Sequence, residues 1–178
     1  MPRYAMIIEP KKCVGCFACR VACQNQNELP VTNQFIHFED KEEGLYPNVT
    51  YTVYPLQCQH CANAPCVSVC PTTASHKDPT TGVTLVTKDK CMGCRRCIGA
   101  CPYNSRTYIK QESVVQACNL CVEHVKKGEE PACVSTCLTK CRTFGDLDNP
   151  QGEFAKLLPK AKHVRTEFGT EPTLLYII

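Results

Sequence analysis

Apolar residues along this chain occur in short runs, separated by proline, glycine and polar positions. Alternation of apolar and polar residues predicts a β-strand over 49–56, VTYTVYPL. A second strand is predicted over 83–86, after a turn at Gly82. No apolar run approaches the roughly 18 residues that a membrane span needs. The pattern therefore predicts many short elements and no membrane-spanning helix.

Helical segments are predicted to be equally short. Residues 122–132 predict a helix that ends near Gly128, and residues 153–164 predict another, broken at Pro159. The apolar residues of 172–178 predict an edge strand or docking tail. Thirteen prolines and nine glycines favour turns over long helices.

Composition changes this picture through one residue type, because the chain has 17 cysteines among 178 residues. Its length allows one domain or two small ones that share a core. The net charge of +3 comes without a basic stripe interleaved with aromatics, so nucleic acid is not expected as a partner. The first 13 residues lack the apolar core and cleavage site of a secretory signal.

Sixteen of the cysteines form four motifs of four. The first and third motifs are spaced CxxCxxCxxxC, the second is CxxCxxxxCxxxC, and the fourth keeps CxxC and CxxxC around an eleven-residue gap. The motifs are Cys13, Cys16, Cys19 and Cys23; Cys58, Cys61, Cys66 and Cys70; Cys91, Cys94, Cys97 and Cys101; and Cys118, Cys121, Cys133 and Cys137. Cys141 is left over, and we expect it to be a small buried thiol, not a ligand.

Three kinds of chemistry use cysteines in this number. A disulfide framework fits poorly, because the count is odd and neighbours in CxxC rarely form structural disulfides. Zinc sites use well-separated CxxC pairs, whereas CxxCxxC crowds three thiols onto one loop. An iron–sulfur cubane takes one thiolate at each iron, and three cysteines at i, i+3 and i+6 reach three of its corners. The spacing therefore predicts four [4Fe–4S] clusters, with every iron filled and none open for catalysis.

With these motifs in this order, the chain resembles bacterial-type ferredoxins. More closely, it resembles the four-cluster iron–sulfur (beta) subunits of the DMSO reductase superfamily of molybdenum enzymes, most of all those of polysulfide and thiosulfate reductases. Supporting stretches are VACQNQNELP at 21–30, CPYNSRTY at 101–108 and RTFGDLDNP at 142–150. Gln24 and Leu138 depart from the proline that follows Cys70 and Cys101, so we expect the two cluster pairs to differ in potential.

The connection between the second and third motifs, with its turn and strand, is typical of one two-cluster ferredoxin unit, in which the last cysteine of each motif serves the other cluster. The resemblance favours nesting, with the first and fourth motifs forming a second unit; pairing of motifs adjacent in sequence is the alternative. The expected ligand sets are Cys13, Cys16, Cys19 and Cys137; Cys58, Cys61, Cys66 and Cys101; Cys91, Cys94, Cys97 and Cys70; and Cys118, Cys121, Cys133 and Cys23.

The expected fold class is therefore α+β, with two bacterial-ferredoxin-like units, nested, plus insertions and a C-terminal extension. The outer unit comprises residues 1–23 and 118–141, and the inner unit comprises 58–117. Residues 24–57 form an insertion and 142–178 the extension, and we expect these segments to pack the units together and to contact partners.

The resemblance implies a non-catalytic electron-transfer subunit. Its partners would be a catalytic subunit with a molybdenum or tungsten bis-pterin cofactor and an integral membrane subunit that exchanges electrons with quinone. A sulfur compound such as polysulfide or thiosulfate would be reduced. The complex would be membrane-associated at the periplasmic face, exported with a partner that carries the signal, or else cytoplasmic. A free-standing polyferredoxin shuttle is the alternative function.

Basic residues and two histidines lie next to the motif cysteines in the sequence. Each oxidised cluster with four thiolates carries −2, so we expect basic residues beside the ligands to compensate: Lys12, Arg20, Lys90, Arg95 and Arg96. His60 and His124 lie next to motif cysteines, but no ligand position is vacant for them. We expect both to support the sites or to lie at the surface.

Overall fold

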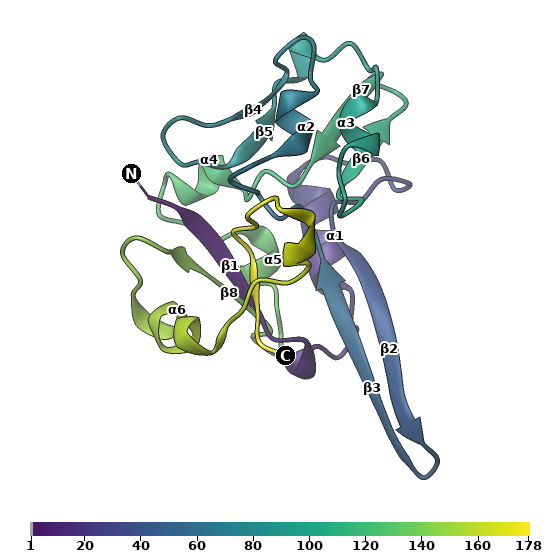
Figure 1. The fold of residues 1–178 in the computed structure, drawn as a ribbon, viewed down its shortest axis with the longest axis vertical. Helices are drawn as coiled ribbons and strands as arrows, with labels where there is room; N and C mark the ends of the chain where they lie inside the picture. The colour runs from purple at the N-terminus through teal and green to yellow at the C-terminus, as the bar shows by residue number, and fades with distance from the viewer. Residues whose placement is uncertain (1) are drawn as a thin grey trace.

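The computed structural model describes residues 2–178, and short strands and shorter helices make up the fold (Figure 1). A three-stranded sheet has β1 (Tyr4–Ile8) at its centre. It pairs antiparallel with β8 (Arg142–Asp146) and parallel with β9 (Leu175–Tyr176). Residues 5–8 are buried on both faces, which explains why β1 lacks the alternation that predicts a strand. For this reason β1 was not predicted from the sequence.

Two antiparallel hairpins and two single-turn helices form the upper part of the molecule in Figure 1. They follow one another closely in sequence, so this region folds from local connections. Helices α2 and α3 pack against each other. The elements are α2 (Pro65–Ser68), β4 (Ser75–Lys77), β5 (Thr84–Val86), a 3₁₀ turn η2 (Lys88–Lys90), α3 (Arg96–Gly99), β6 (Arg106–Ile109) and β7 (Val114–Ala117).

Below them, segments from the two ends of the chain lie together. A 3₁₀ turn, η1 (Pro10–Lys12), leads to α1 (Ala18–Gln26), which packs against α5 (Ala132–Ser135). The helix predicted over 122–132 is confirmed only as α4 (Val122–Val125). None of the helices in residues 2–178 has the length and apolar character required to cross a membrane.

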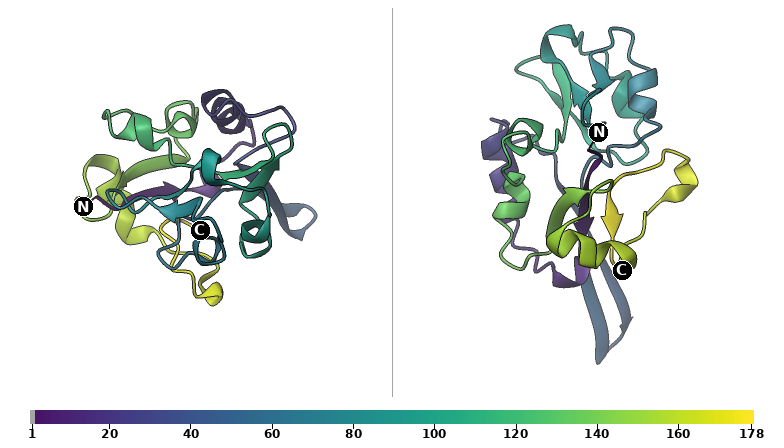
Figure 2. Two further views of the ribbon diagram at one scale, coloured as in Figure 1. Left: turned by 90° about the horizontal axis from the view of Figure 1, so that it is seen from above. Right: turned by 90° about the vertical axis from the view of Figure 1, so that its left-hand side faces the viewer.

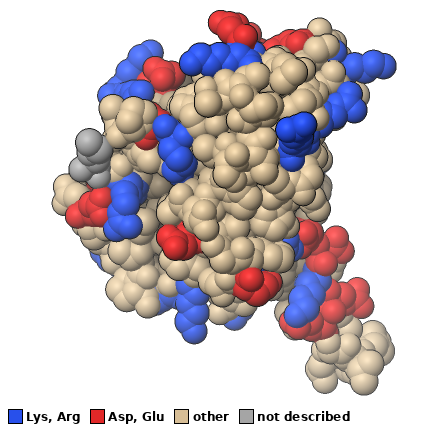
Figure 3. Space-filling model, turned by 45° about the horizontal axis from the view of Figure 1, so that its top comes forward, with Lys and Arg blue, Asp and Glu red and all other residues tan. Residues whose placement is uncertain are grey.

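The insertion forms an arm of two strands, β2 (His37–Leu45) and β3 (Asn48–Leu56), that projects from the rest of the molecule (Figures 1 and 2). The strand predicted over 49–56 is confirmed; its partner β2 was missed because HFEDKEEGL is mostly charged. The tip of the arm does not pack on either unit, because Leu45 and Tyr46 are 85% and 93% exposed. The expected contact of the insertion with partners stays a prediction. In Figure 3 the shaft carries charged side chains and the tip carries none.

The C-terminal segment, residues 147–178, packs on the three-stranded sheet and on the second cysteine motif. Helix α6 (Gly152–Leu157) packs on the sheet and is followed by the 3₁₀ turn η3 (Leu158–Lys160), so the predicted break at Pro159 is confirmed. After η4 (Thr166–Phe168), the backbone of residues 170–173 hydrogen-bonds to Gln59 and Asn63 of the second motif. The predicted edge strand near the C-terminus is confirmed as β9.

Candidate iron–sulfur centres

The four CxxC loops share one backbone feature. In each, the residue before the second cysteine has a positive φ: Gly15 (+66°), His60 (+46°), Gly93 (+68°) and Leu120 (+53°). Glycine adopts this left-handed conformation without strain, whereas His60 and Leu120 must be held in it by their surroundings. The four loops therefore curl in the same way, although only two of them contain glycine.

Three cysteines of the second motif and the last cysteine of the third line one cavity. Cys58, Cys61, Cys66 and Cys101 surround about 310 Å³ of space, closed on one side by Tyr103. The Tyr103 hydroxyl lies 2.5 Å from the Thr170 hydroxyl, so the C-terminal segment helps to cover this cavity.

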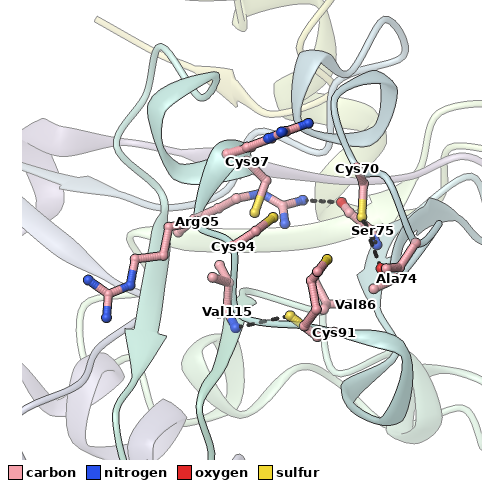
Figure 4. A pocket seen from close by; sticks show the side chains of 13 residues that line it. Cys70, Ala74, Ser75, Val86, Cys91, Cys94, Arg95, Cys97 and Val115 are labelled. Atoms are coloured by element: carbon pink, nitrogen blue, oxygen red, sulfur yellow. Dashed lines mark hydrogen bonds between the residues drawn. The ribbon is translucent and has the colours of Figure 1, made fainter.

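A second cavity, of about 330 Å³, has the reciprocal lining of Cys91, Cys94, Cys97 and Cys70 (Figure 4). Backbone N–H groups donate to two of its sulfurs: Ser75 to Cys70 and Val115 to Cys91, each at 3.4 Å. The inner motifs are thus interleaved, because each cavity takes three cysteines from one motif and one from the other.

The outer motifs meet in the same manner. Cys13, Cys16, Cys19 and Cys137 line a cavity of about 320 Å³, which Cys141 also lines. Packing of α1 on α5 brings Cys23 to the fourth motif: burial raises the pKa of Cys23 to about 12, and the neighbouring thiols of Cys133 and Cys121 add to the rise. Burial and the nearby Cys23 raise the pKa of Cys118 as well.

These sites fit clusters better than single ions. Three cavities of nearly equal volume each contain one predicted set of four cysteines in their lining, with Cys141 as a fifth cysteine in the outer one. Within residues 2–178, no three Cys, His, Asp or Glu side chains are arranged to hold one metal ion. A tetrahedral zinc site needs that convergence, whereas a [4Fe–4S] cluster takes each thiolate at a separate iron.

Cys70 and Cys137, each the last cysteine of its motif, differ from the buried cysteines in the direction of their pKa shift. Burial acts to raise the pKa of Cys70, but hydrogen bonds from the Ser75 N–H and the Thr72 hydroxyl outweigh it, and the pKa is lowered. Burial of Cys137 is outweighed in the same way, and its pKa is also lowered. In contrast, burial raises the pKa of Cys58 to about 12, so that thiol needs bound iron to ionise at neutral pH.

The basic residues expected to compensate the thiolates lie mainly at the surface. Lys12, Lys90, Arg95 and Arg96 are exposed; Lys12 pairs with Glu9 at 2.6 Å. Half-buried Arg20 stacks on Phe17 and Phe38. Three cations in the interior were not predicted: Arg106 and Arg142, which are buried, and Lys77, which is half-buried. Both arginines lie five residues after the last cysteine of a motif, a shared offset that would have identified them.

Neither histidine joins a cysteine set. His60 is fully buried and accepts a hydrogen bond at Nδ1 from the Thr84 N–H, 3.3 Å away. Burial lowers the pKa of His60 to about 3, and the charges of Lys77 and Arg106 add to the effect. Partly exposed His124 lies near Gln26 and Glu129. His60 is therefore buried within the second motif, whereas His124 lies near the surface.

Comparison with known proteins shows the same cofactor. The 4Fe-4S dicluster domain matches residues 49–147 and, in a second form, residues 12–74. The chain belongs to the 4Fe-4S dicluster family. The predicted four [4Fe–4S] clusters are confirmed at this level, because two dicluster matches and 17 cysteines support four clusters.

Relatives of this dicluster protein include named subunits of a reductase and of a dehydrogenase. It is 40% identical to the "Protein NrfC homolog" of Haemophilus influenzae, over 98% of this chain and 80% of the relative. It is 34% identical to the "Arsenate respiratory reductase iron-sulfur subunit ArrB" of Shewanella sp. strain ANA-3, over 98% and 96%. It is 34% identical to a subunit of the sulfite dehydrogenase of Allochromatium vinosum, over 99% and 83%. The prediction of an electron-transfer subunit, not a catalytic one, is confirmed.

Proposed function

We propose that sixteen cysteines hold the four clusters in nested pairs. Each cluster takes three cysteines from one motif and the last cysteine of the partner motif, second with third and first with fourth. The three cavities with such linings and the packing of α1 on α5 support this ligand assignment. The nested domain limits, with the outer unit at 1–23 and 118–141 around the inner unit at 58–117, belong to the same proposal.

With these ligands, the chain relays electrons between two partner subunits. One is a membrane subunit that exchanges electrons with quinone, and the other is a catalytic subunit with a molybdenum or tungsten bis-pterin cofactor. The bound clusters supply one-electron redox chemistry. The chain encloses them, and the observation that carries the proposal is that each of the four cysteine sets is complete, which leaves no iron for a substrate.

The substrate of the complex is proposed to be a sulfur compound, polysulfide or thiosulfate. Resemblance of the stretches at 21–30, 101–108 and 142–150 supports this substrate class. Relatives named for arsenate and for sulfite are equally identical, at 34%, so overall similarity does not separate these chemistries. We place the complex at the periplasmic face of the membrane, with the chain exported beside a partner that carries the signal.

Anaerobic purification of the tagged chain from its native cell tests these proposals. Four clusters of four irons each predict about sixteen iron and sixteen sulfide atoms per chain. A large subunit with a pterin cofactor should co-purify, and its activity on polysulfide, thiosulfate, arsenate and sulfite identifies the substrate. A stable monomer with full iron content and no partner would favour the shuttle, and a colourless protein without iron would contradict both.

A further inference from the structure

Two buried arginines occupy equivalent positions in the inner and outer pairs of cysteine sets. Arg106 follows Cys101 by five residues and Arg142 follows Cys137 by five. Each begins a strand, β6 or β8, and they are 6% and 2% exposed. Each arginine therefore follows a cysteine motif at the same offset, and its side chain lies in the interior.

Arg106 lies between the two inner cavities and lines both of them. Its Nη2 donates to Cys66 Sγ at 2.9 Å, on one side, and to Ser75 Oγ at 2.7 Å. The Ser75 N–H in turn donates to Cys70 Sγ in the other cavity. One guanidinium thus contacts, directly or through one residue, a sulfur of each inner set.

Arg142 has the corresponding place in the outer pair. It lines the cavity of Cys13, Cys16, Cys19 and Cys137, and its Nη1 donates to Gln57 Oε1 and to Met6 Sδ. Burial acts to lower the pKa of Arg142, but the thiolates of Cys133 and Cys19 outweigh it and raise the pKa. Those two cysteines belong to different outer sets, so this guanidinium also faces both.

Neither arginine has an acidic partner. Within residues 2–178, no Asp or Glu forms an ion pair with Arg106 or Arg142. Nε and Nη1 of Arg106 and Nη2 of Arg142 are buried without a hydrogen-bond partner among these residues. An unpaired buried charge is strongly unfavourable. The compensating negative charge must therefore come from the cysteine thiolates and whatever they bind.

We propose that Arg106 and Arg142 set the reduction potentials of the clusters through their positive charge. One arginine acts on both clusters of each pair. A cluster becomes more negative by one charge when it accepts an electron. A fixed positive charge in a low-dielectric interior favours that state, so the arginine raises the potential of both neighbours. The inference rests on the ligand assignment proposed above.

The test is Arg106→Gln in the anaerobic holoprotein, followed by redox titration with EPR detection. Signals are assigned to their pairs with the single variants Cys101→Ser and Cys137→Ser. We expect both inner clusters to become at least tenfold harder to reduce, which for one electron is about 59 mV. Both outer clusters should keep their potentials, and Arg142→Gln should give the reverse result.

Arg95→Gln is the matched control. It removes the same charge beside the same inner cavity, but Arg95 is exposed and stacks on Tyr108, with its side chain directed away from the cysteines in Figure 4. Solvent screens that charge. We therefore expect a clearly smaller shift than in Arg106→Gln.

Four intact clusters with unshifted potentials would overturn the proposal, as would a shift in one inner cluster only or an equal shift in all four. If Arg106→Gln holds fewer clusters, Arg106→Met decides, because it also removes the charge but places no amide in the interior: a shift confined to the inner pair supports tuning, and cluster loss or unchanged potentials overturns it. The iron content of the wild-type chain and the cysteine variants test the ligand assignment separately. A failure there is therefore distinguishable from a failure of the arginine proposal.

Discussion

The inner and outer pairs of cysteine sets contain the same parts but are closed by different connections. The inner pair lies within residues 58–117, where the β4–β5 hairpin links the second motif to the third and the β6–β7 hairpin follows the third. The outer pair joins segments from opposite ends of the chain through α1 on α5 and through pairing of β1 with β8. Cysteine spacing thus specifies the cofactor in both pairs, whereas the order of elements decides whether closure is local or needs the whole chain.

Small differences around the sulfurs accompany this difference in closure. Proline follows Cys70 and Cys101 in the inner pair, but Gln24 and Leu138 take these positions in the outer pair. Ser105, buried before Arg106, corresponds to Cys141, buried before Arg142. Both changes alter polarity close to a cluster, and potentials respond to such changes. The expectation that the two pairs differ in potential stays a prediction.

The largest effect is expected from removing the cysteine that one motif contributes to the cluster of its partner motif. Cys101→Ser should disturb the cluster of the second motif and leave that of its own motif, because Cys101 lines the cavity of Cys58, Cys61 and Cys66. Cys137→Ser should act in the same way on the first motif. EPR and iron analysis measure the loss. Disturbance of the cluster in the variant's own motif would contradict nesting.

Alanine substitutions of the glycines in the first and third motifs should destabilise the holoprotein by different amounts. Alanine at Gly15 or Gly93 is strained by the positive φ, by roughly 1–2 kcal/mol. At Gly93 the added Cβ would also overlap the Ser113 carbonyl oxygen, whereas at Gly15 it would meet only Val53 Cγ2, at 3.6 Å. Gly93→Ala should therefore destabilise the holoprotein by about 1–3 kcal/mol more. Denaturant midpoints measured without air compare the two, and equal midpoints would refute the difference.

A smaller effect is expected at the turn between β4 and β5, which Lys126 contacts just after α4. Burial acts to raise the pKa of Asp78, but hydrogen bonds from Thr80 and Thr81 and the charge of Lys126 outweigh it and lower the pKa to about 2. The ionised carboxylate therefore contributes stability above its ordinary pKa of 3.8, and this is lost only as the pH falls towards 2.

Asp78→Asn should thus lower the free energy of unfolding by about 1–2 kcal/mol, equally at pH 6 and pH 8. Asp89→Asn, at an exposed position of η2, is the control and should change stability by less than about 0.5 kcal/mol. A defect of Asp78→Asn that disappears at pH 6 would contradict this account of the turn.

The smallest effect is expected from Cys141→Ser, which gives the outer pair the residue type found at Ser105. The holoprotein should keep four clusters, with at most about a threefold change in the reduction equilibrium of the cluster beside Cys13. Redox titration measures it. Loss of that cluster would instead make the 2%-exposed Cys141 a ligand.

The sequence was most informative where chemistry alone sets the spacing. Sets of cysteines predict clusters, and prolines and glycines predict turns such as the break at Pro159, because each depends on residue type. Strand β1 was missed because burial on both faces removes alternation, and β2 because its side chains face solvent on an arm. Arg106 and Arg142 share an offset of five residues from the last cysteine of a motif, which marks their positions, but their burial follows from tertiary packing.

The position of β1 between β8 and β9 has a consequence for biosynthesis. Strand β1 precedes all four cysteine motifs in the chain, yet both of its neighbours follow the fourth motif. Residues 170–173, which lie over the second motif, also come from the final stretch of the chain. During translation the early motifs therefore stay uncovered until these later segments have been made, and the cell's iron–sulfur donors have that interval in which to fill them.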